Sequence, residues 1–136
     1  MPKFNEQAYI ACDFKAKSAI RDYLDSKGVL TNIKEDYGPD IQSWQKVWHE
    51  VEIKSGWNNE WPPSWKTVHI PSRKKKYLER GKVMFWVLNK TCDRAILIDG
   101  KHLEDDYLEV IPNKRYPEGE YFYDIPIHLT KFVDLT

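Results

Sequence analysis

The sequence has little cysteine, no long apolar run and no secretion signal, and each absence narrows the class of protein. The two cysteines among 136 residues, Cys12 and Cys92, match neither a metal-ligand nor a redox spacing, so we expect reduced thiols rather than a disulfide. A helix that spans a bilayer needs about 18 consecutive apolar residues, and the chain has no such run. Its start, MPKFNEQAYI, lacks the charged-then-apolar order of a signal peptide. We therefore expect a cytoplasmic protein that has no membrane partner.

The chain also lacks net charge, because 21 basic residues balance 21 acidic ones, but the two signs are separated along the sequence. Residues 64–90 contain eight Lys or Arg and one Glu, whereas residues 95–136 contain four basic and nine acidic residues. A polyanion responds to the local patch, so the basic segment is compatible with a nucleic-acid partner. The ordinary alternative for such a charge run is a solvated helix face.

The length and the apolar content predict one domain that covers residues 1–136, since 41% hydrophobic residues fill one core and leave no room for a second domain of ordinary size. From Asp13 to Lys27 the apolar residues recur at three- and four-residue steps before Gly28, which predicts an amphipathic helix. Alternating segments then predict an antiparallel meander over Val29–Glu35, Ile41–Trp48 and Val47–Lys54.

The second half of the chain predicts a loop, a helix and buried strands. Trp-Pro-Pro favours a loop from Trp57 to Pro71, and Ser72 is a good N-cap for a short helix that ends near Arg80, before Gly81. The apolar runs Val83–Leu88 and Ala95–Ile98 are typical of strands buried on both faces. Tyr107–Ile111 and the tail are expected at a sheet edge. The expected order is αβββαβ, which is an α/β fold.

Polar residues on the third predicted strand form a candidate site. Side chains two positions apart on a strand share a face, so Glu50, Glu52 and Lys54 point one way while Val51 and Ile53 point to the core. If the strand that begins at Asp40 pairs with this one, Asp40 and Glu52 converge on a divalent cation, with the Ile53 carbonyl as a further ligand. Mg²⁺ prefers such hard oxygen donors. Lys54 would orient the attacking water. The alternative is a same-face ion pair on an exposed strand, which contributes little.

GPD at 38–40 followed by EVEIKSGW at 50–57 resembles the motif of the PD-(D/E)xK nuclease superfamily, in its restriction-endonuclease-like and phage Holliday-junction-resolvase-like branch. The resemblance implies a restriction-endonuclease-like αβββαβ core with a mixed central sheet flanked by helices. It implies that Asp40 and Glu52 bind Mg²⁺ or Mn²⁺ and that Lys54 is the motif lysine. If the chain is viral, the cytoplasm would be that of the host cell.

The first predicted helix departs from that family's pattern. Related resolvases often carry a Glu where this chain has Lys17. Asp13, one turn earlier, and Glu50, on the strand, are the candidates to replace it. A second metal site is therefore left open.

The basic helix and the loop before it supply candidate DNA contacts. Cations from Arg73 to Lys76 fill the first helical turn, where the helix dipole disfavours them and a phosphate would offset the cost. We expect Arg73, Lys74 and Lys76 to grip phosphate and Lys75 to face solvent. His69 either donates to a phosphate or packs locally.

Three tryptophans, Trp57, Trp61 and Trp65, lie in the loop between the motif and the basic helix. They pack on the core or across a dimer interface, or else Trp57 or Trp61 stacks on an unpaired base. The other histidines, His49, His102 and His128, show no metal-ligand spacing.

These features together predict a Mg²⁺-dependent DNA endonuclease that acts on branched or structured DNA. A chain this small favours a symmetric homodimer when two strands are to be cut, and no organic cofactor is expected. Two alternatives stay open. One is a nucleic-acid-binding module on the same fold that has lost activity, and the other is a protein-interaction module that uses the aromatic loop.

Overall fold

The computed structural model describes residues 6–29, 31–32, 41–43, 46–112 and 117–136, and only the backbone at residues 6–13 and 32. Its long helix α1 spans Glu6–Ser26, so it begins seven residues before the predicted start. Gly28 follows with φ +76°, the left-handed conformation expected just after a helix. Ala16, Ile20 and Leu24 form the buried face of α1, because residues four apart lie on one side of a helix.

The central sheet has six strands in the order β1-β2-β3-β5-β6-β9. They are β1 (Thr31–Asn32), β2 (Ile41–Ser43), β3 (Trp48–Ile53), β5 (Val83–Leu88), β6 (Arg94–Asp99) and β9 (Lys131–Asp134). The pairing of β3 with β5 is parallel and the other pairings are antiparallel. The predicted meander and the two buried strands are confirmed within the described residues, and the sheet is mixed.

A second sheet, in the order β4-β8-β7, is formed by segments that were predicted as loop and tail. Its strands are β4 (Thr67–Pro71), β7 (Leu108–Ile111) and β8 (Glu120–Pro126). The predicted loop from Trp57 to Pro71 is therefore wrong over its last five residues. β7 is an edge strand, as expected for that segment, but β8 is the centre of the second sheet.

Short 3₁₀ helices connect the strands. They are η1 (Ser72–Arg80), η2 (Gly100–His102), η3 (Asp105–Tyr107) and η4 (Ile127–Leu129). The bounds of η1 match the predicted short helix, but the expected Ser72 cap is wrong. Pro71 occupies the capping position, where its side chain makes no capping hydrogen bond.

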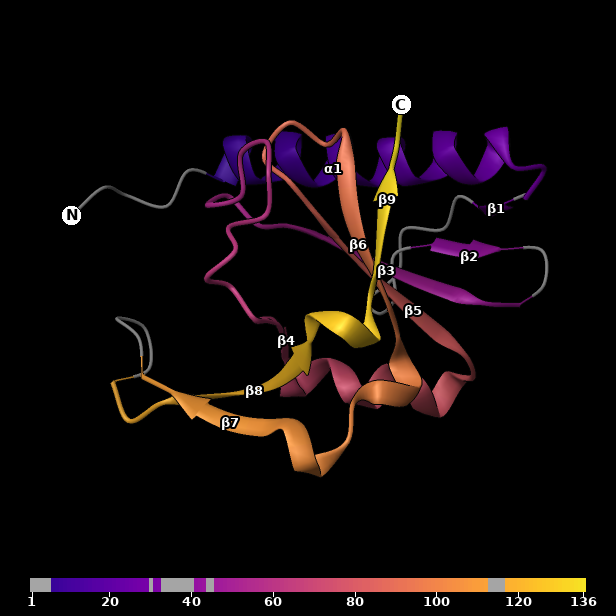
Figure 1. Cartoon of the computed structure of the whole chain (residues 1–136). Coiled ribbons are helices and arrows are strands. Elements are labelled where there is room, and N and C mark those ends of the chain that lie inside the picture. Colours follow the sequence, from indigo (N-terminus) through magenta and orange to yellow (C-terminus); the bar gives the residue numbers. More distant parts are fainter. Residues whose placement is uncertain (1–5, 30, 33–40, 44–45, 113–116) are drawn as a thin grey trace.

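The molecule has three layers, with α1 on one face of the central sheet and the second sheet with η1 on the other (Figure 1). Val51 and Trp86 belong to the core beneath α1. Phe85 and Val87 pack on the other side, against Ile70 and other residues of the second sheet. The fold is therefore mixed α/β, and no helix in the described part of the chain is long and apolar enough to cross a membrane.

His49 ties β3 to β5 on the α1 side of the sheet. Its Nδ1 accepts a hydrogen bond of 2.9 Å from Nε1 of Trp86, which requires the imidazole to be unprotonated at that nitrogen. His49 is buried, and burial lowers its pKa from 6.5 to about 4, because the charged form is poorly solvated there. The residue is therefore neutral at physiological pH.

Acid should destabilise the protein through His49. In the unfolded chain this histidine binds a proton near pH 6.5, whereas in the folded chain it does so only near pH 4. The free energy of unfolding is therefore expected to fall by about 3 kcal/mol as the pH drops through that window. His49→Asn keeps an acceptor for Trp86 without a titrating ring, so urea unfolding of the variant should show a flatter pH dependence. Parallel pH profiles for the two proteins would contradict this role.

Candidate functional site

Two carboxylates of β3 lie on the face of the central sheet opposite to α1. Glu50 pairs with Phe85 and Glu52 with Val87 in the parallel register of β3 and β5. Phe85 and Val87 belong to the core beneath the second sheet, so the two glutamates share that side. The predicted sharing of a face is confirmed for these two, and Glu50 is almost fully buried.

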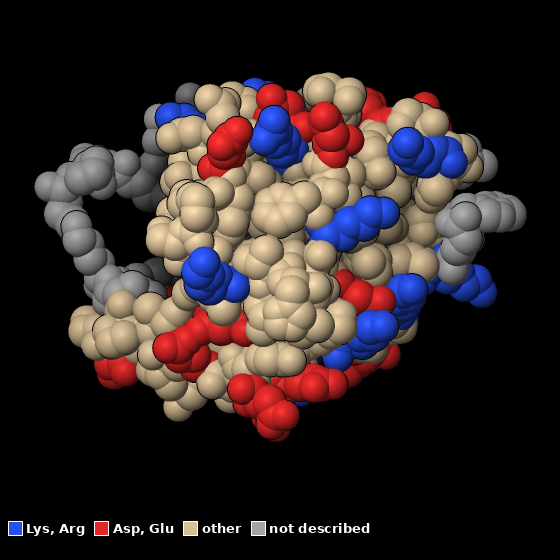
Figure 2. Space-filling view, in the orientation of Figure 1, with Lys and Arg blue, Asp and Glu red and all other residues tan. Residues whose placement is uncertain are grey.

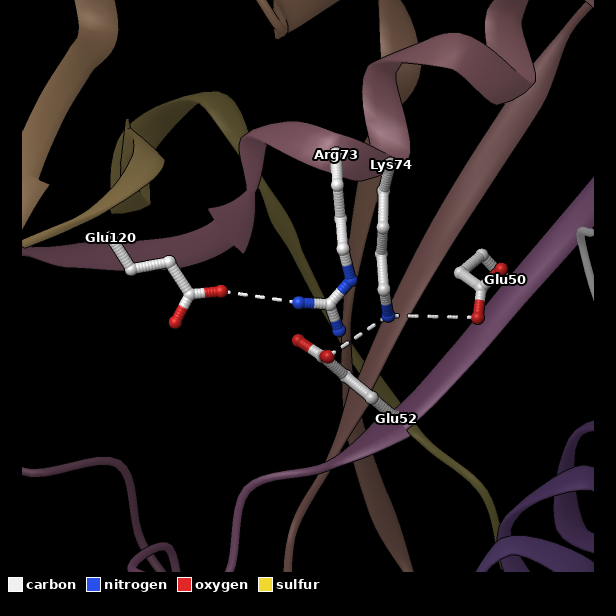
Figure 3. Close-up of polar contacts among 5 residues, drawn as sticks. All are labelled: Glu50, Glu52, Arg73, Lys74 and Glu120. Atoms are coloured by element: carbon white, nitrogen blue, oxygen red, sulfur yellow. Dashed lines mark hydrogen bonds and ion pairs between the residues drawn. The ribbon is translucent and has the colours of Figure 1, made fainter. Parts of the chain in front are cut away.

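The topology brings a cation over these carboxylates. Parallel strands require a crossover connection, and the one between β3 and β5 carries β4 and η1 across the face where the glutamates lie. Lys74 of η1 is buried, and its Nζ lies 3.1 Å from Oε2 of Glu52 and 3.5 Å from Oε1 of Glu50 (Figure 3). An ammonium thus sits between two carboxylates that come from one strand.

Arg73 extends from η1 beside Lys74 toward β3 (Figure 3). Its guanidinium donates to Oε1 of Glu120 over 3.1 Å, and two-thirds of its side chain is exposed. Some of the η1 side chains that were expected to contact phosphate therefore already pair with carboxylates of the protein. Lys74 is turned to the glutamates, whereas Lys76 is exposed, with its Nζ 5.9 Å from the centre of the Tyr77 ring.

The basic segment meets the acidic second half of the chain in the fold. Over η1, blue and red side chains stand next to one another on the surface (Figure 2). Besides the pairs of Lys74, this segment forms the ion pairs Arg73–Glu120 at 3.1 Å, Lys75–Asp105 at 3.6 Å and Lys82–Asp99 at 3.9 Å. Lys75 is only partly solvated, because it also lies 5.5 Å from the centre of the Tyr123 ring. The local charge excess seen in the sequence is therefore smaller on the surface.

Lys54 contacts the loop that carries Trp61 and Trp65. It follows the end of β3, and its backbone N–H donates to the Leu88 carbonyl over 2.8 Å. Its Nζ lies 5.0 Å from the centre of the Trp65 ring, in a cation–π contact. The ammonium that approaches the carboxylates is that of Lys74. Lys54 stands at the border between the carboxylates of β3 and the aromatic loop.

Asp40, the first acid of the predicted motif, lies outside the described residues, as does the side chain of Asp13. The strand that begins directly after Asp40 is described. In it, Ile41 pairs with His49, the neighbour of Glu50. Lys17 lies on α1 and is partly exposed.

Trp57 and His69 are engaged within the protein. Trp57 is 1% exposed and packs edge-to-face on Trp61 at 5.3 Å between ring centres, so its ring is not open to a base. Packing on the core, the alternative to base stacking, is what the structure shows for Trp57. Nδ1 of His69 lies 3.3 Å from Oδ1 of Asp124 on the neighbouring strand β8, which is the local packing expected as the alternative to a phosphate contact.

The glutamate pair has the chemistry of a divalent-cation site. Two carboxylate oxygens approach one ammonium within 3.5 Å, so the space between them accepts positive charge. Mg²⁺ is commonly held by one or two carboxylates together with water, and Glu50 and Glu52 fit that donor set. Among the described residues, no three or more His, Cys, Asp or Glu are arranged to hold a metal. Asp40 is not one of the described residues, so this statement does not cover it. Ile53 ends β3 directly beside Glu52, where its carbonyl was expected to contribute.

The sequence pointed to Glu50 and Lys74 in other roles than the ones the structure gives them, since Lys74 was expected to bind phosphate. Glu50 was only a candidate replacement for an acid on the first helix, although its alternation with Glu52 places both on one face. Lys74 is one of four consecutive cations, and only the depth at which η1 packs distinguishes it from the others.

Comparison of the chain with protein-family models, with curated proteins and with solved structures gives no match.

Replacing Lys74 should destabilise the protein, because Glu50 would keep a buried charge without this partner. Lys74→Met is expected to lower the free energy of unfolding by about 3 kcal/mol at neutral pH. The loss should shrink at acidic pH, because protonation of a carboxylate removes the negative charge that Lys74 balances. Urea unfolding at both pH values measures the effect.

Lys76→Met is the matched control, since it removes the same charge from the exposed side of η1. It should change stability by less than about 0.5 kcal/mol. Equal effects of the two substitutions would show that the contacts of Lys74 with the glutamates contribute nothing.

Proposed function

We propose that the protein is a divalent-metal-dependent endonuclease that hydrolyses phosphodiester bonds of DNA at the Glu50–Glu52 pair. The observation that carries the proposal is the convergence of these two carboxylates on one cation, beneath a helix rich in Lys and Arg. Carboxylates that gather at a cation position next to basic side chains are what metal-assisted phosphodiester cleavage needs.

The order of elements supports the same proposal. α1, the antiparallel β1-β2-β3 series, a crossover that contains β4 and the 3₁₀ helix η1, and the parallel strand β5 follow one another along the chain. The order is αβββαβ if η1 takes the place of the second helix and β4 is counted as an insertion. This is the order implied by the resemblance to the PD-(D/E)xK nucleases. In that scheme Asp40, which directly precedes β2, is the third acid of the site, and the Ile53 carbonyl is a further oxygen ligand.

The residues of the chain divide the chemistry among them. Glu50 and Glu52 hold the cation, which when bound neutralises charge on the phosphate and lowers the pKa of water. Lys54 orients the attacking water from the end of β3. Lys74 is the counter-ion of the two glutamates in this structure. A bound cation would take over that role, and the Lys74 ammonium would then be available to a phosphate oxygen. Arg73 and Lys76 bind flanking phosphates.

A second function is favoured by the position of Lys74. Its ammonium already lies between Glu50 and Glu52, so the two carboxylates have a positive partner without a metal at this place. A module that binds DNA without cleaving it would need no metal between these carboxylates. Cleavage assays separate the two functions.

Cleavage should depend on the acids of β3 and on Lys54. With Mg²⁺ or Mn²⁺, the wild-type protein is expected to cut plasmid and branched DNA, and Glu52→Gln and Lys54→Ala should each reduce the rate at least about a hundredfold. Lys101→Ala, an exposed lysine of η2, is the control and should cut normally. Gel assays of supercoiled plasmid and of a four-way junction measure the rates.

The other outcomes of this assay are also informative. Equal nicking by wild type and Lys54→Ala would identify a contaminating nuclease and remove the enzyme proposal. DNA binding without cleavage would select the binding module. The absence of both would select a protein-interaction module.

Removal of Lys74 should strengthen cation binding, because its ammonium competes for the same carboxylate oxygens. Lys74→Met is expected to bind Mn²⁺ about tenfold more tightly than the wild type, a difference of about 1.4 kcal/mol. The spin resonance signal of free Mn²⁺ measures binding in the absence of DNA. An affinity that is unchanged or weaker in the variant would place the cation elsewhere.

A further inference from the structure

An apolar groove is lined in part by Trp65, the aromatic ring that Lys54 contacts. It encloses about 630 Å³, within the range of about 300–1,000 Å³ that is typical of small-ligand sites. Its walls are aromatic rings and prolines, among them Trp61, Trp65, Phe132, Pro62, Pro63 and Pro126. Phe132 is 48% exposed, so part of its surface is open to an occupant of the groove.

The aromatic wall is rigid, although it lies in a loop. Nε1 of Trp61 donates to the Trp65 carbonyl over 2.7 Å, and the two rings meet edge-to-face with centres 5.0 Å apart. Trp61 also meets Phe132 at 6.3 Å, so the rings brace one another.

The same loop is hydrogen-bonded to the β5–β6 hairpin. Lys90 N–H donates to the Trp57 carbonyl over 2.8 Å, and the Asn89 amide donates to the Asn58 carbonyl over 2.9 Å. On the opposite wall, Ile127 N–H donates to the Lys66 carbonyl. The groove is therefore formed in advance of any ligand.

The charge around the groove is of one kind. Lys66 and His128 line it, and no Asp or Glu is among its lining residues in the described part of the chain. Lys54 lies against Trp65, a ring that also lines the groove. An occupant should therefore combine a flat apolar part, which fits between the rings, with a negative charge at the lysines.

We propose that this groove binds an unpaired nucleobase of single-stranded DNA, with the adjacent phosphates at Lys54 and Lys66. The inference rests on the proposed function and deepens it, since Lys54 joins the groove to the Glu50–Glu52 pair. Bases stack on aromatic side chains without sequence preference, and basic residues follow the backbone. The substrate would then be DNA with an exposed single strand, such as a flap, a gap or an open branch.

Two other occupants fit the groove less well. A base inside a duplex stacks on its neighbours and cannot enter a recess of this size without being flipped out. A proline-rich peptide docks in aromatic grooves through an extended helix, but its recognition does not call for lysines at the wall. The cations of the wall favour a polyanion.

Fluorescence anisotropy with labelled oligothymidylate and with a blunt hairpin duplex of the same length tests the proposal. Binding is measured in EDTA at fixed ionic strength, so that cleavage does not enter. The wild type should prefer the single strand, and Phe132→Ala should raise its dissociation constant about tenfold. Phe132→Tyr keeps the ring and should stay within about twofold of the wild type.

Phe14→Ala is the matched control, because it removes a 65% exposed ring from α1, on the other face of the central sheet. It should bind oligothymidylate like the wild type. Since Phe132 is half exposed, its truncation should leave the fold intact, which circular dichroism checks. Quenching of tryptophan fluorescence by oligothymidylate gives a second measurement that needs no variant.

Three results would overturn the proposal. They are wild-type affinity in Phe132→Ala, an equal loss of affinity for the single strand and the duplex, and capture of a proline-rich peptide in place of oligothymidylate. Failure of the hydrolase proposal looks different, since no cleavage would be seen while binding still depends on Phe132. Conversely, if Phe132→Ala cleaves single-stranded DNA at the wild-type rate in the presence of metal, the proposal that the groove binds a base is wrong and the nuclease proposal stands.

Discussion

The ion pairs of Lys74 with Glu50 and Glu52 hold the 3₁₀ helix η1 against strand β3 of the central sheet. The Glu50 side chain is 9% exposed and that of Glu52 is 32% exposed. A buried carboxylate such as that of Glu50 needs a positive charge nearby, because water solvates it poorly there. The crossover from β3 to β5 supplies that charge through η1. The carboxylate oxygens that attract Lys74 could also bind another cation in its place. The same oxygen atoms therefore hold η1 over β3 and form the proposed metal site.

Local patterns in the sequence were sufficient for much of the central sheet and for η1. Val83–Leu88 became β5 with the predicted bounds, since a continuous apolar run fits a strand that is covered on both faces. The second sheet was not foreseen. β4 begins at Thr67, soon after the Trp-Pro-Pro stretch in the sequence, and ends at Pro71. Its partner β8 lies about fifty residues further along the chain, so tertiary contacts decide this pairing.

The candidate site was predictable as far as strand geometry reaches. The alternation of Glu50 and Glu52 determined their common face. The spacing of the four cations predicted a phosphate contact for Lys74, but not its burial against the two glutamates. The depth of a side chain depends on how its helix packs. For the same reason Trp57, which looked no different from Trp61 in sequence, became part of the core. Lys54 met the Trp65 ring because the loop folds back on the end of β3.

The bond between Lys90 and the Trp57 carbonyl has a consequence for molecular recognition. It joins the loop that carries the three tryptophans to the β5–β6 hairpin of the central sheet, so this part of the loop cannot open without breaking a bond to the hairpin. Loop ordering, which commonly opposes association through lost conformational entropy, has here been completed during folding. A ligand at this surface would bind to an ordered loop rather than a flexible one. Its dissociation rate would then depend on how well it packs against the aromatic rings.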